Sequence, residues 1–159
     1  MNLGTSLQFG IRYLAVLTSA SLLWEFAHMP FYTLWQTGTA GHIAFAAIHC
    51  TIGDALIGMA ALALAVVFAG GAHWPHKRRV RVAVVMILLG LIYTVFSEWL
   101  NVELRQSWAY RDIMPTVPPI GTGLTPLLQW IVIPLVAYRY SLGAVRTNVR
   151  NRPKASVES

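Results

Sequence analysis

The chain has 159 residues, of which 56% are hydrophobic and only 11% are charged, and its mean hydropathy is +0.56. Since charged residues make up about 25% of a typical soluble domain, this composition excludes an ordinary soluble globular protein and predicts an integral membrane protein. Membrane topology and attraction to anionic lipid head groups explain the net charge of +6, and we expect no nucleic acid partner.

Four segments are long and apolar enough to cross a bilayer, which takes about 20 mostly apolar residues in a helix. They are residues 9–29, 43–69, 80–100 and 124–142. The first is not expected to be a cleaved signal peptide, because it has no basic start and carries Trp24 and Glu25 where small residues precede a cleavage site. The sequence therefore predicts an all-α polytopic membrane protein, with residues 1–142 forming a bundle of four transmembrane helices.

The distribution of basic residues predicts the orientation, because short loops rich in Lys and Arg stay in the cytoplasm. The second connection, between residues 69 and 80, is basic and has no acidic residue, and the tail 143–159 is also basic. The first connection, 30–41, has no Lys or Arg, and the third, 102–123, balances its two arginines with two acidic residues. We therefore expect a bacterial inner-membrane protein with both termini cytoplasmic, a disordered tail 143–159, and an outward loop 102–123 that caps the bundle.

Three acidic residues, Glu25, Asp54 and Glu98, lie inside the predicted spans. Each charged group at the centre of a span costs roughly 2.5–3.5 kcal/mol on insertion scales, so such residues normally face the interior of a helix bundle. Asp54 lies five residues after His49 and is expected on a different side of its helix, either paired elsewhere or at the floor of a cavity. The acidic residues therefore predict a polar interior.

The other polar residues of the spans gather toward the same outward half of the bundle. Glu25 and His28 are three positions apart, His42 and His49 are seven apart, and each pair shares a helix face. On the third span, Thr94, Glu98, Asn101 and Arg105 form one polar stripe, and Gln129 lies near the start of the fourth span. The inward halves of the spans contain few polar groups, so the sequence predicts a pocket that opens outward.

Aromatic residues show the same outward bias, the candidate pocket residues being Trp24, Trp99, Trp108, Tyr110 and Trp130. An interfacial aromatic belt would produce a similar bias, and both explanations stay open. Glu25 is followed ten residues later by Trp35, as Glu98 is by Trp108. This faint repeat indicates that the bundle is built from two parallel helical hairpins with a site at their interface.

The segment SWAYRDIMPTVPPIGTGLTPLLQW, residues 107–130, resembles a W-x-Y, Gly, then Pro segment of the small multi-pass lycopene cyclases. That resemblance implies a helical membrane protein that acts on an isoprenoid without a redox change. In the cyclases an acidic pair follows the proline, whereas here Leu127 and Leu128 follow Pro126. More broadly, the chain resembles a group of small bacterial inner-membrane proteins that share the WE, HCTxGD and SEWxNV segments, which implies a fold and a location but no activity.

We therefore expect a pocket that binds or acts on a lipid-like or isoprenoid molecule by cyclase-like or isomerase-like acid–base chemistry. A carboxyl group buried among apolar groups can act as a general acid near neutral pH, and aromatic faces can stabilise a cationic intermediate. The candidate catalytic residues are Glu25, His28, His49, Glu98 and Asn101. The candidate substrate-binding residues are Trp24, Asp54, Trp99, Trp108, Tyr110, Gln129 and Trp130.

Two alternatives stay open. In the first, the protein is an accessory subunit of a membrane complex, or a small transporter, whose polar groups hold the helices together or carry protons; either a homo-oligomer or a hetero-oligomer is compatible with the sequence. In the second, a metal or haem binds to Glu25, His28, His42 and His49, because Glu-x-x-His on a helix is a ligand pair of di-metal bundles. No cofactor is predicted by the preferred hypothesis, whose partners are membrane lipids and a hydrophobic small molecule.

Overall fold

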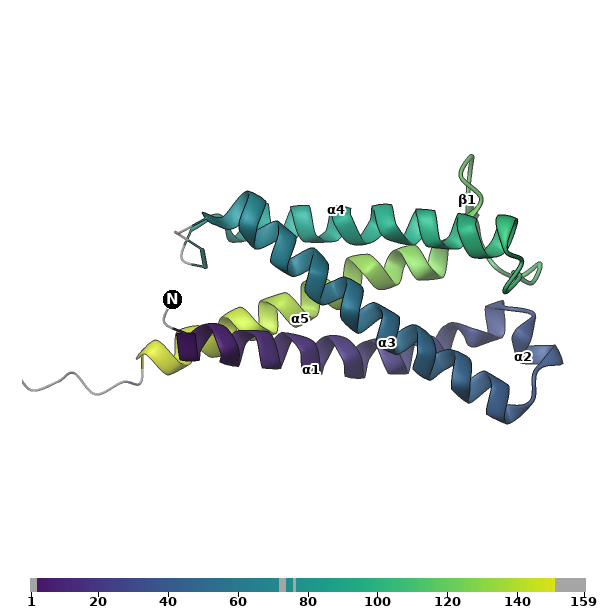
Figure 1. The fold of residues 1–159 in the computed structure, drawn as a ribbon, viewed down its shortest axis with the longest axis horizontal. Coiled ribbons are helices and arrows are strands. Elements are labelled where there is room, and N and C mark those ends of the chain that lie inside the picture. The colour runs from purple at the N-terminus through teal and green to yellow at the C-terminus, as the bar shows by residue number, and fades with distance from the viewer. Residues whose placement is uncertain (1–2, 72–73, 76, 151–159) are drawn as a thin grey trace, which may run out of the picture.

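The computed structural model describes residues 3–71, 74–75 and 77–150 (Figure 1). Within that part of the chain the long elements are α1 (Leu3–His28), α3 (Ala40–Ala65), α4 (Arg79–Glu98) and α5 (Leu124–Arg150). The short elements are η1 (Met29–Phe31), α2 (Leu34–Thr37), η2 (Val66–Gly70), η4 (Trp99–Leu104), β1 (Thr116–Val117) and β2 (Thr122–Gly123). The protein is mostly helical, which confirms the predicted all-α class.

The long helices run alternately in opposite directions and pack against one another. Both α1 and α4 contact α3 and α5. As Figure 1 shows, the start of α1 and the end of α5 lie at one end of the bundle, and α2 and the β1–β2 hairpin lie at the other. We call the half of the bundle nearest the helix termini Leu3 and Arg150 the terminal half, and the half nearest α2 and the hairpin the loop half.

Two of the described helices are long and apolar enough to cross a membrane, judged by length and composition: Ala40–Gly70 and Arg79–Leu104, each with a mean hydropathy of 2.2. Helices α1 and α5 do not qualify by this measure, because polar residues such as Arg12 and Glu25 in α1 and Gln129 and Arg139 in α5 lower their hydropathy. The prediction of four spans is therefore supported only for α3 and α4.

The helix boundaries differ from the predicted ones in three places. Helix α1 begins at Leu3, and α4 continues beyond residue 100 as the π-helical segment η4. Helix α5 continues to Arg150, so residues 143–150 are helical, although the sequence predicted a disordered tail there. The reason is that residues 143–150 contain no proline to interrupt the helix, and the next proline in the chain is Pro153. Residues 151–159 of the predicted tail lie outside the described residues.

The terminal half contains a continuous apolar core. Its buried side chains are Phe9, Tyr13, Leu17, Ala61, Leu62, Ala65, Ala69, Val82, Ala83, Met86, Ile133, Ala137 and Tyr138. The Tyr13 hydroxyl is fully buried in the core and lies 3.4 Å from the Gly58 carbonyl oxygen and 3.3 Å from the Met86 sulfur. Gly58 lies so close to Leu17 that a Cβ atom there would clash with the leucine side chain. Small residues on α3 thus allow close helix packing, which closes this half of the bundle.

The outer surface of the bundle is apolar on all four long helices. Large exposed hydrophobic side chains include Ile11 and Leu23 on α1, Phe45 and Leu56 on α3, Val84 and Ile92 on α4, and Ile131 and Val136 on α5. The polar and charged residues Ser21, Glu25, His28, Thr51, Thr94, Glu98, Gln129 and Ser141 are buried. An exposed apolar surface of this extent is unusual for a soluble monomer.

The segment from Arg105 to Gly123, which we call the cap, lies against the end of α1 and the chain that follows it. The Thr33 amide donates to the Ala109 carbonyl at 3.0 Å, and the Arg111 amide donates to the Phe31 carbonyl at 2.9 Å. An isolated antiparallel bridge pairs Tyr32 with Tyr110. The cap ends in the β1–β2 hairpin, in which Thr116 pairs with Gly123. Main-chain hydrogen bonds thus hold the cap over the loop half.

Candidate functional site

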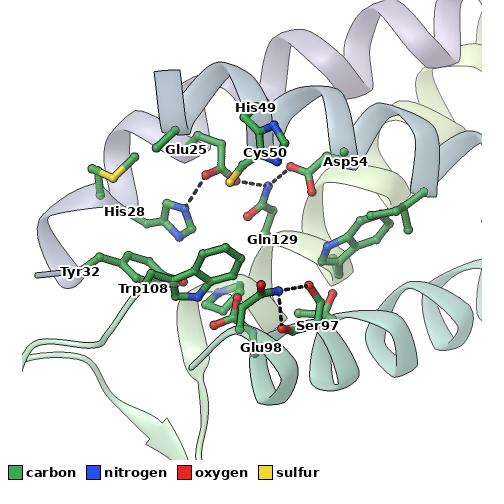
Figure 2. A pocket seen from close by; sticks show the side chains of 18 of the residues that line it. Glu25, His28, Tyr32, His49, Cys50, Asp54, Ser97, Glu98, Trp108 and Gln129 are labelled. Atoms are coloured by element: carbon green, nitrogen blue, oxygen red, sulfur yellow. Dashed lines mark hydrogen bonds and ion pairs between the residues drawn. The ribbon is translucent and has the colours of Figure 1, made fainter. Parts of the chain in front are cut away.

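A pocket of about 310 Å³ lies in the loop half, between the four long helices and the cap (Figure 2). Its polar and aromatic lining residues are Glu25, His28, Tyr32, His49, Cys50, Asp54, Tyr93, Thr94, Ser97, Glu98, Asn101, Arg105, Trp108, Gln129 and Trp130. Apolar side chains, among them Met29, Leu34 and Ile57, complete the walls. The pocket therefore combines an apolar cavity with carboxyl groups from three helices.

One wall is a hydrogen-bonded chain that links three helices. On α1, the spacing of three residues places His28 beside Glu25, with 3.1 Å between His28 Nε2 and Glu25 Oε2. From α5, Gln129 Nε2 donates to Glu25 Oε1 at 3.1 Å and to Asp54 Oδ2 on α3 at 2.6 Å. His28 Nδ1 also lies 3.4 Å from the Thr125 hydroxyl at the start of α5. The Gln129 amide thus holds two carboxyl groups that would otherwise repel each other.

The Gln129 contacts also fix the orientation of its amide group. Both hydrogens of Nε2 are directed at carboxylate oxygens, and the reversed orientation would place the amide oxygen against these two acceptors. The carbonyl oxygen Oε1 therefore points away from Glu25 and Asp54 and toward the space between His28 and Trp108 (Figure 2). Gln129 lines the pocket and is only 4% exposed overall, so this oxygen faces the cavity and not the outer surface of the bundle.

The opposite wall is built around Glu98 near the end of α4. The Tyr110 hydroxyl, from the cap, donates a hydrogen bond to Glu98 Oε2 and accepts one of 3.0 Å from the Gly123 amide. Burial, and then the Glu98 charge, raise the pKa of Tyr110 above its ordinary value, so the hydroxyl remains protonated and can donate. The indole N–H of Trp108 lies near the Glu98 carboxylate but is buried and makes no hydrogen bond to a described residue.

The polar stripe predicted on the third span faces the pocket. Thr94, Glu98, Asn101 and Arg105 are all lining residues. The wider turn of η4, in which the Arg105 amide donates to the Leu100 carbonyl at 2.8 Å, follows Glu98 directly. Such π-helical turns are frequent at functional sites. Asn101 Nδ2 donates to the Ser97 carbonyl at 2.9 Å, which fixes the amide at the pocket wall.

The structure brings most of the predicted site residues together. Those that line the pocket are Glu25, His28, His49, Asp54, Glu98, Asn101, Trp108, Gln129 and Trp130. Asp54 joins this set although its spacing from His49 predicted a different side of α3. His49 is largely exposed at the rim, where its ring stacks on Phe45 with 5.7 Å between centroids. Tyr110 lies behind the wall and reaches the pocket through Glu98.

The structure does not place Trp24 or Trp99 in the pocket wall. Each is adjacent in sequence to a pocket glutamate, and consecutive helical residues point about 100° apart, so these side chains face elsewhere. Trp24 packs against the core of the terminal half, and its indole N–H is buried with no partner among the described residues. Trp99 is 51% exposed and lies beside Phe96 on the outer surface.

The residues of the alternative metal site do not form a ligand set. Among the described residues, no three His, Cys, Asp or Glu side chains come together as a group that could hold a metal ion. His42 is exposed in the first turn of α3, where its backbone amide donates to the Thr39 hydroxyl, and it does not line the pocket. Glu25 and His28 bind each other instead.

Several pocket residues, including Tyr32 and Cys50, were missed by the sequence reasoning. Tyr32 is buried, and its ring centroid lies 5.3 Å from that of His28 and 5.5 Å from that of Tyr110. It belongs to a connection, for which helical periodicity gives no signal. Cys50 lies four residues before Asp54, which places both on one face of α3.

No family model, curated protein or solved structure matches the chain.

Proposed function

We propose that this protein crosses a bacterial inner membrane with α1, α3, α4 and α5, and that its pocket binds a lipid-like or isoprenoid molecule. Buried carboxyl groups would carry out acid–base chemistry of the cyclase or isomerase type on this molecule. The observation that carries the proposal is the pocket itself, in which Glu25, Asp54 and Glu98 from three helices face a cavity of about 310 Å³ with largely apolar and aromatic walls.

The four-span arrangement is supported by the surface of the bundle. Helices α1 and α5 expose apolar side chains, such as Leu23 and Val136, just as α3 and α4 do. The polar residues that lower the hydropathy of α1 and α5 include Glu25 and Gln129, which are buried inside the bundle. Basic residues at the start of α4, among them Arg79 and Arg81, favour a cytoplasmic terminal half. On this topology the pocket opens on the outward side.

The size of the pocket and the residues that line it indicate the size and hydrophobicity of the ligand. A volume of about 310 Å³ lies at the lower end of the range for small-molecule sites, about 300–1,000 Å³. The rings of Tyr32, Trp108 and Trp130 and the aliphatic side chains around them suit a hydrophobic body. Because aromatic faces attract positive charge, the same walls would stabilise a cationic intermediate.

The two walls offer separate acid–base groups. Glu25 contacts His28, so a proton can pass between the carboxyl group and the imidazole. Glu98 stands across the cavity and receives a hydrogen bond from Tyr110. Acid–base catalysis of an isomerisation needs one group to add a proton and another to remove one, each within hydrogen-bond reach of the substrate. Glu98 and Glu25 stand on different walls of one cavity, so one can add a proton to a bound substrate while the other removes one.

Transport is supported less well. A transporter of this size would need a route for its substrate through the terminal half, where Tyr13, Leu17 and Met86 are fully buried in the core. An accessory-subunit role is compatible with the apolar outer surface, but a structural function does not require an open cavity lined by carboxyl groups.

The proposal is tested by identifying what the pocket contains. Wild type, Glu25→Gln, Glu98→Gln and the control Glu103→Gln are purified in lipid nanodiscs, and bound molecules are extracted and measured by mass spectrometry. Glu103 is exposed and does not line the pocket. We expect wild type and the control to retain one hydrophobic compound whose occupancy falls about tenfold or more in the two pocket variants, the loss that corresponds to a charged hydrogen bond of roughly 1.5–3 kcal/mol.

Thermal unfolding of each variant shows whether the fold is retained. An identical lipid content in all four folded proteins would contradict the proposal. A stoichiometric metal or haem in wild type, measured in the same preparation, would favour the redox alternative instead.

A further inference from the structure

We infer that the polar group of the ligand is a cation, namely an ammonium group attached to a hydrophobic chain, and that it binds between Glu98 and the carbonyl oxygen of Gln129. This inference rests on the proposed function, since it names the chemical class of the ligand that the same pocket would bind.

Several hydrogen-bond donors of the pocket already bind other protein groups. Both hydrogens of Gln129 Nε2 are donated to Glu25 and Asp54. Asn101 Nδ2 is directed at the Ser97 carbonyl and hydroxyl, and the two ring nitrogens of His28 face Glu25 and Thr125. These donors are thus directed at other protein groups, and the indole N–H of Trp108 lies beside Glu98 without a hydrogen bond among the described residues.

Acceptors, in contrast, remain available. Gln129 is 96% buried, being 4% exposed, and its carbonyl oxygen is directed into the pocket without a hydrogen-bond partner among the described residues. Glu98 is 8% exposed, and Tyr110 occupies only one of its two carboxylate oxygens. Neither the Gln129 carbonyl oxygen nor the second Glu98 oxygen is among the fully buried polar atoms of the described residues that lack a partner, so both reach the open space of the pocket. A ligand that brings hydrogen-bond donors can therefore bind them.

The charged residues that line the pocket also favour a cation. Glu25, Asp54 and Glu98 line the pocket together with a single arginine, Arg105, which is exposed at the rim. Carboxylates that share a poorly solvated site repel one another unless a positive charge or protons compensate them. An ammonium group supplies both the charge and up to three donors. A phosphate or carboxylate head group would add negative charge and more acceptors, so we expect the pocket to reject it.

The aromatic walls point to the same class. Trp108 and Trp130 come from the cap and from α5, and both line the cavity that the carboxyl groups face. Tyr32 adds a third ring, packed against His28. A cation over a Trp or Tyr face gains roughly 0.5–2 kcal/mol, while the rings also contact the hydrophobic part of the ligand. A hydrophobic ammonium compound uses both properties.

Cys50 provides the readout, because it is the chain's single cysteine and lines the pocket. Its alkylation by N-ethylmaleimide is followed in nanodiscs loaded with equal mole fractions of decylamine, decanol or decyl phosphate. We expect decylamine to slow alkylation about tenfold more than decanol does, and decyl phosphate to have no effect. The tenfold preference of wild type for decylamine should disappear in Glu98→Gln and persist in Glu103→Gln.

A Cys50→Ala, Ile48→Cys variant places the thiol on the exposed face of α3 and corrects for changes in the membrane itself. The comparison of the three probes in wild type does not depend on any variant being folded. Equal protection by decanol, or better protection by decyl phosphate, would overturn the inference and leave the proposed hydrophobic pocket intact. Protection by none of the three would contradict the proposed function as well.

Discussion

The two halves of the helix bundle are built from the same four helices but solve opposite packing problems. The terminal half contains small residues on α3 that let Leu17 pack against Gly58, and its few polar groups bind within the core. In the loop half, carboxyl and amide groups replace the apolar core, and the helices leave a cavity of about 310 Å³ between them. The cap lies over the end of this half.

This difference indicates that the two halves of the bundle have different roles. Close packing in the terminal half supplies stability, because buried apolar side chains there form a continuous core. The loop half contains buried carboxyl groups whose desolvation is unfavourable and tolerates them because Gln129 and Tyr110 donate hydrogen bonds to them. Substitutions in the first half should therefore change stability, and substitutions in the second should change what the pocket admits.

The largest effect is expected from Leu17→Ala in the terminal half. Leu17 is 1% exposed, and truncating a buried leucine lowers the free energy of unfolding by about 2–5 kcal/mol. The rate of Cys50 alkylation should stay within about twofold of wild type, because Leu17 does not line the pocket. Chemical unfolding of the protein in micelles measures the first quantity.

The control is Leu23→Ala, which removes the same atoms from a side chain that is 73% exposed and should change stability by less than about 0.5 kcal/mol. Equal destabilisation by both substitutions would mean that the terminal half is not the source of stability.

An intermediate effect is expected from Gly90→Ala, which links the two halves. A Cβ atom at Gly90 on α4 would clash with the ring of Trp130, a pocket residue on α5. Overpacking of this kind costs about 1–3 kcal/mol, and the displaced ring should reduce the protection of Cys50 by a bound ligand. Thermal unfolding and the alkylation assay measure the two consequences.

Gly53→Ala is the matched control, because Gly53 also lines the pocket but a Cβ atom there would contact nothing within 4 Å. If Gly53→Ala destabilises as much as Gly90→Ala, the clash with Trp130 is not the cause. A smaller ring in a Gly90→Ala, Trp130→Phe variant should recover part of the lost stability.

The smallest effect is expected from Tyr110→Phe, which removes the hydroxyl that joins the cap to Glu98 and the Gly123 amide. The loss should be about 1–2 kcal/mol, with faster alkylation of Cys50 as the cap loosens. Because the pKa of Tyr110 is raised, the contribution of the hydroxyl should be fully present below pH of about 10 and be lost only as the pH rises through the raised value.

Tyr140→Phe, at a position that is 61% exposed on α5, controls for the loss of a tyrosine hydroxyl. Unchanged alkylation of Cys50 in Tyr110→Phe would show that the cap does not limit access to the pocket.

The sequence predicted the helices well, because long apolar runs and charged loops are local signals. It also predicted much of the pocket, since the spacing of Glu98, Asn101 and Arg105 specifies one helix face. Trp24 and Trp99 were assigned to the pocket from their depth alone, and depth does not determine which way a side chain points. The contact between Gln129 and Asp54 depends on how two distant helices pack, a property that no local pattern reports.

The way in which the cap is attached has a consequence for how the protein can change during evolution. Its bonds to residues 31–33 run from main chain to main chain, at Thr33, Ala109, Arg111 and Phe31. Main-chain bonds do not depend on the identity of the side chains, so cap residues that face the pocket, such as Trp108, can be exchanged while the segment keeps its position. Descendants of one ancestral chain can therefore acquire differently lined pockets without first evolving a new fold.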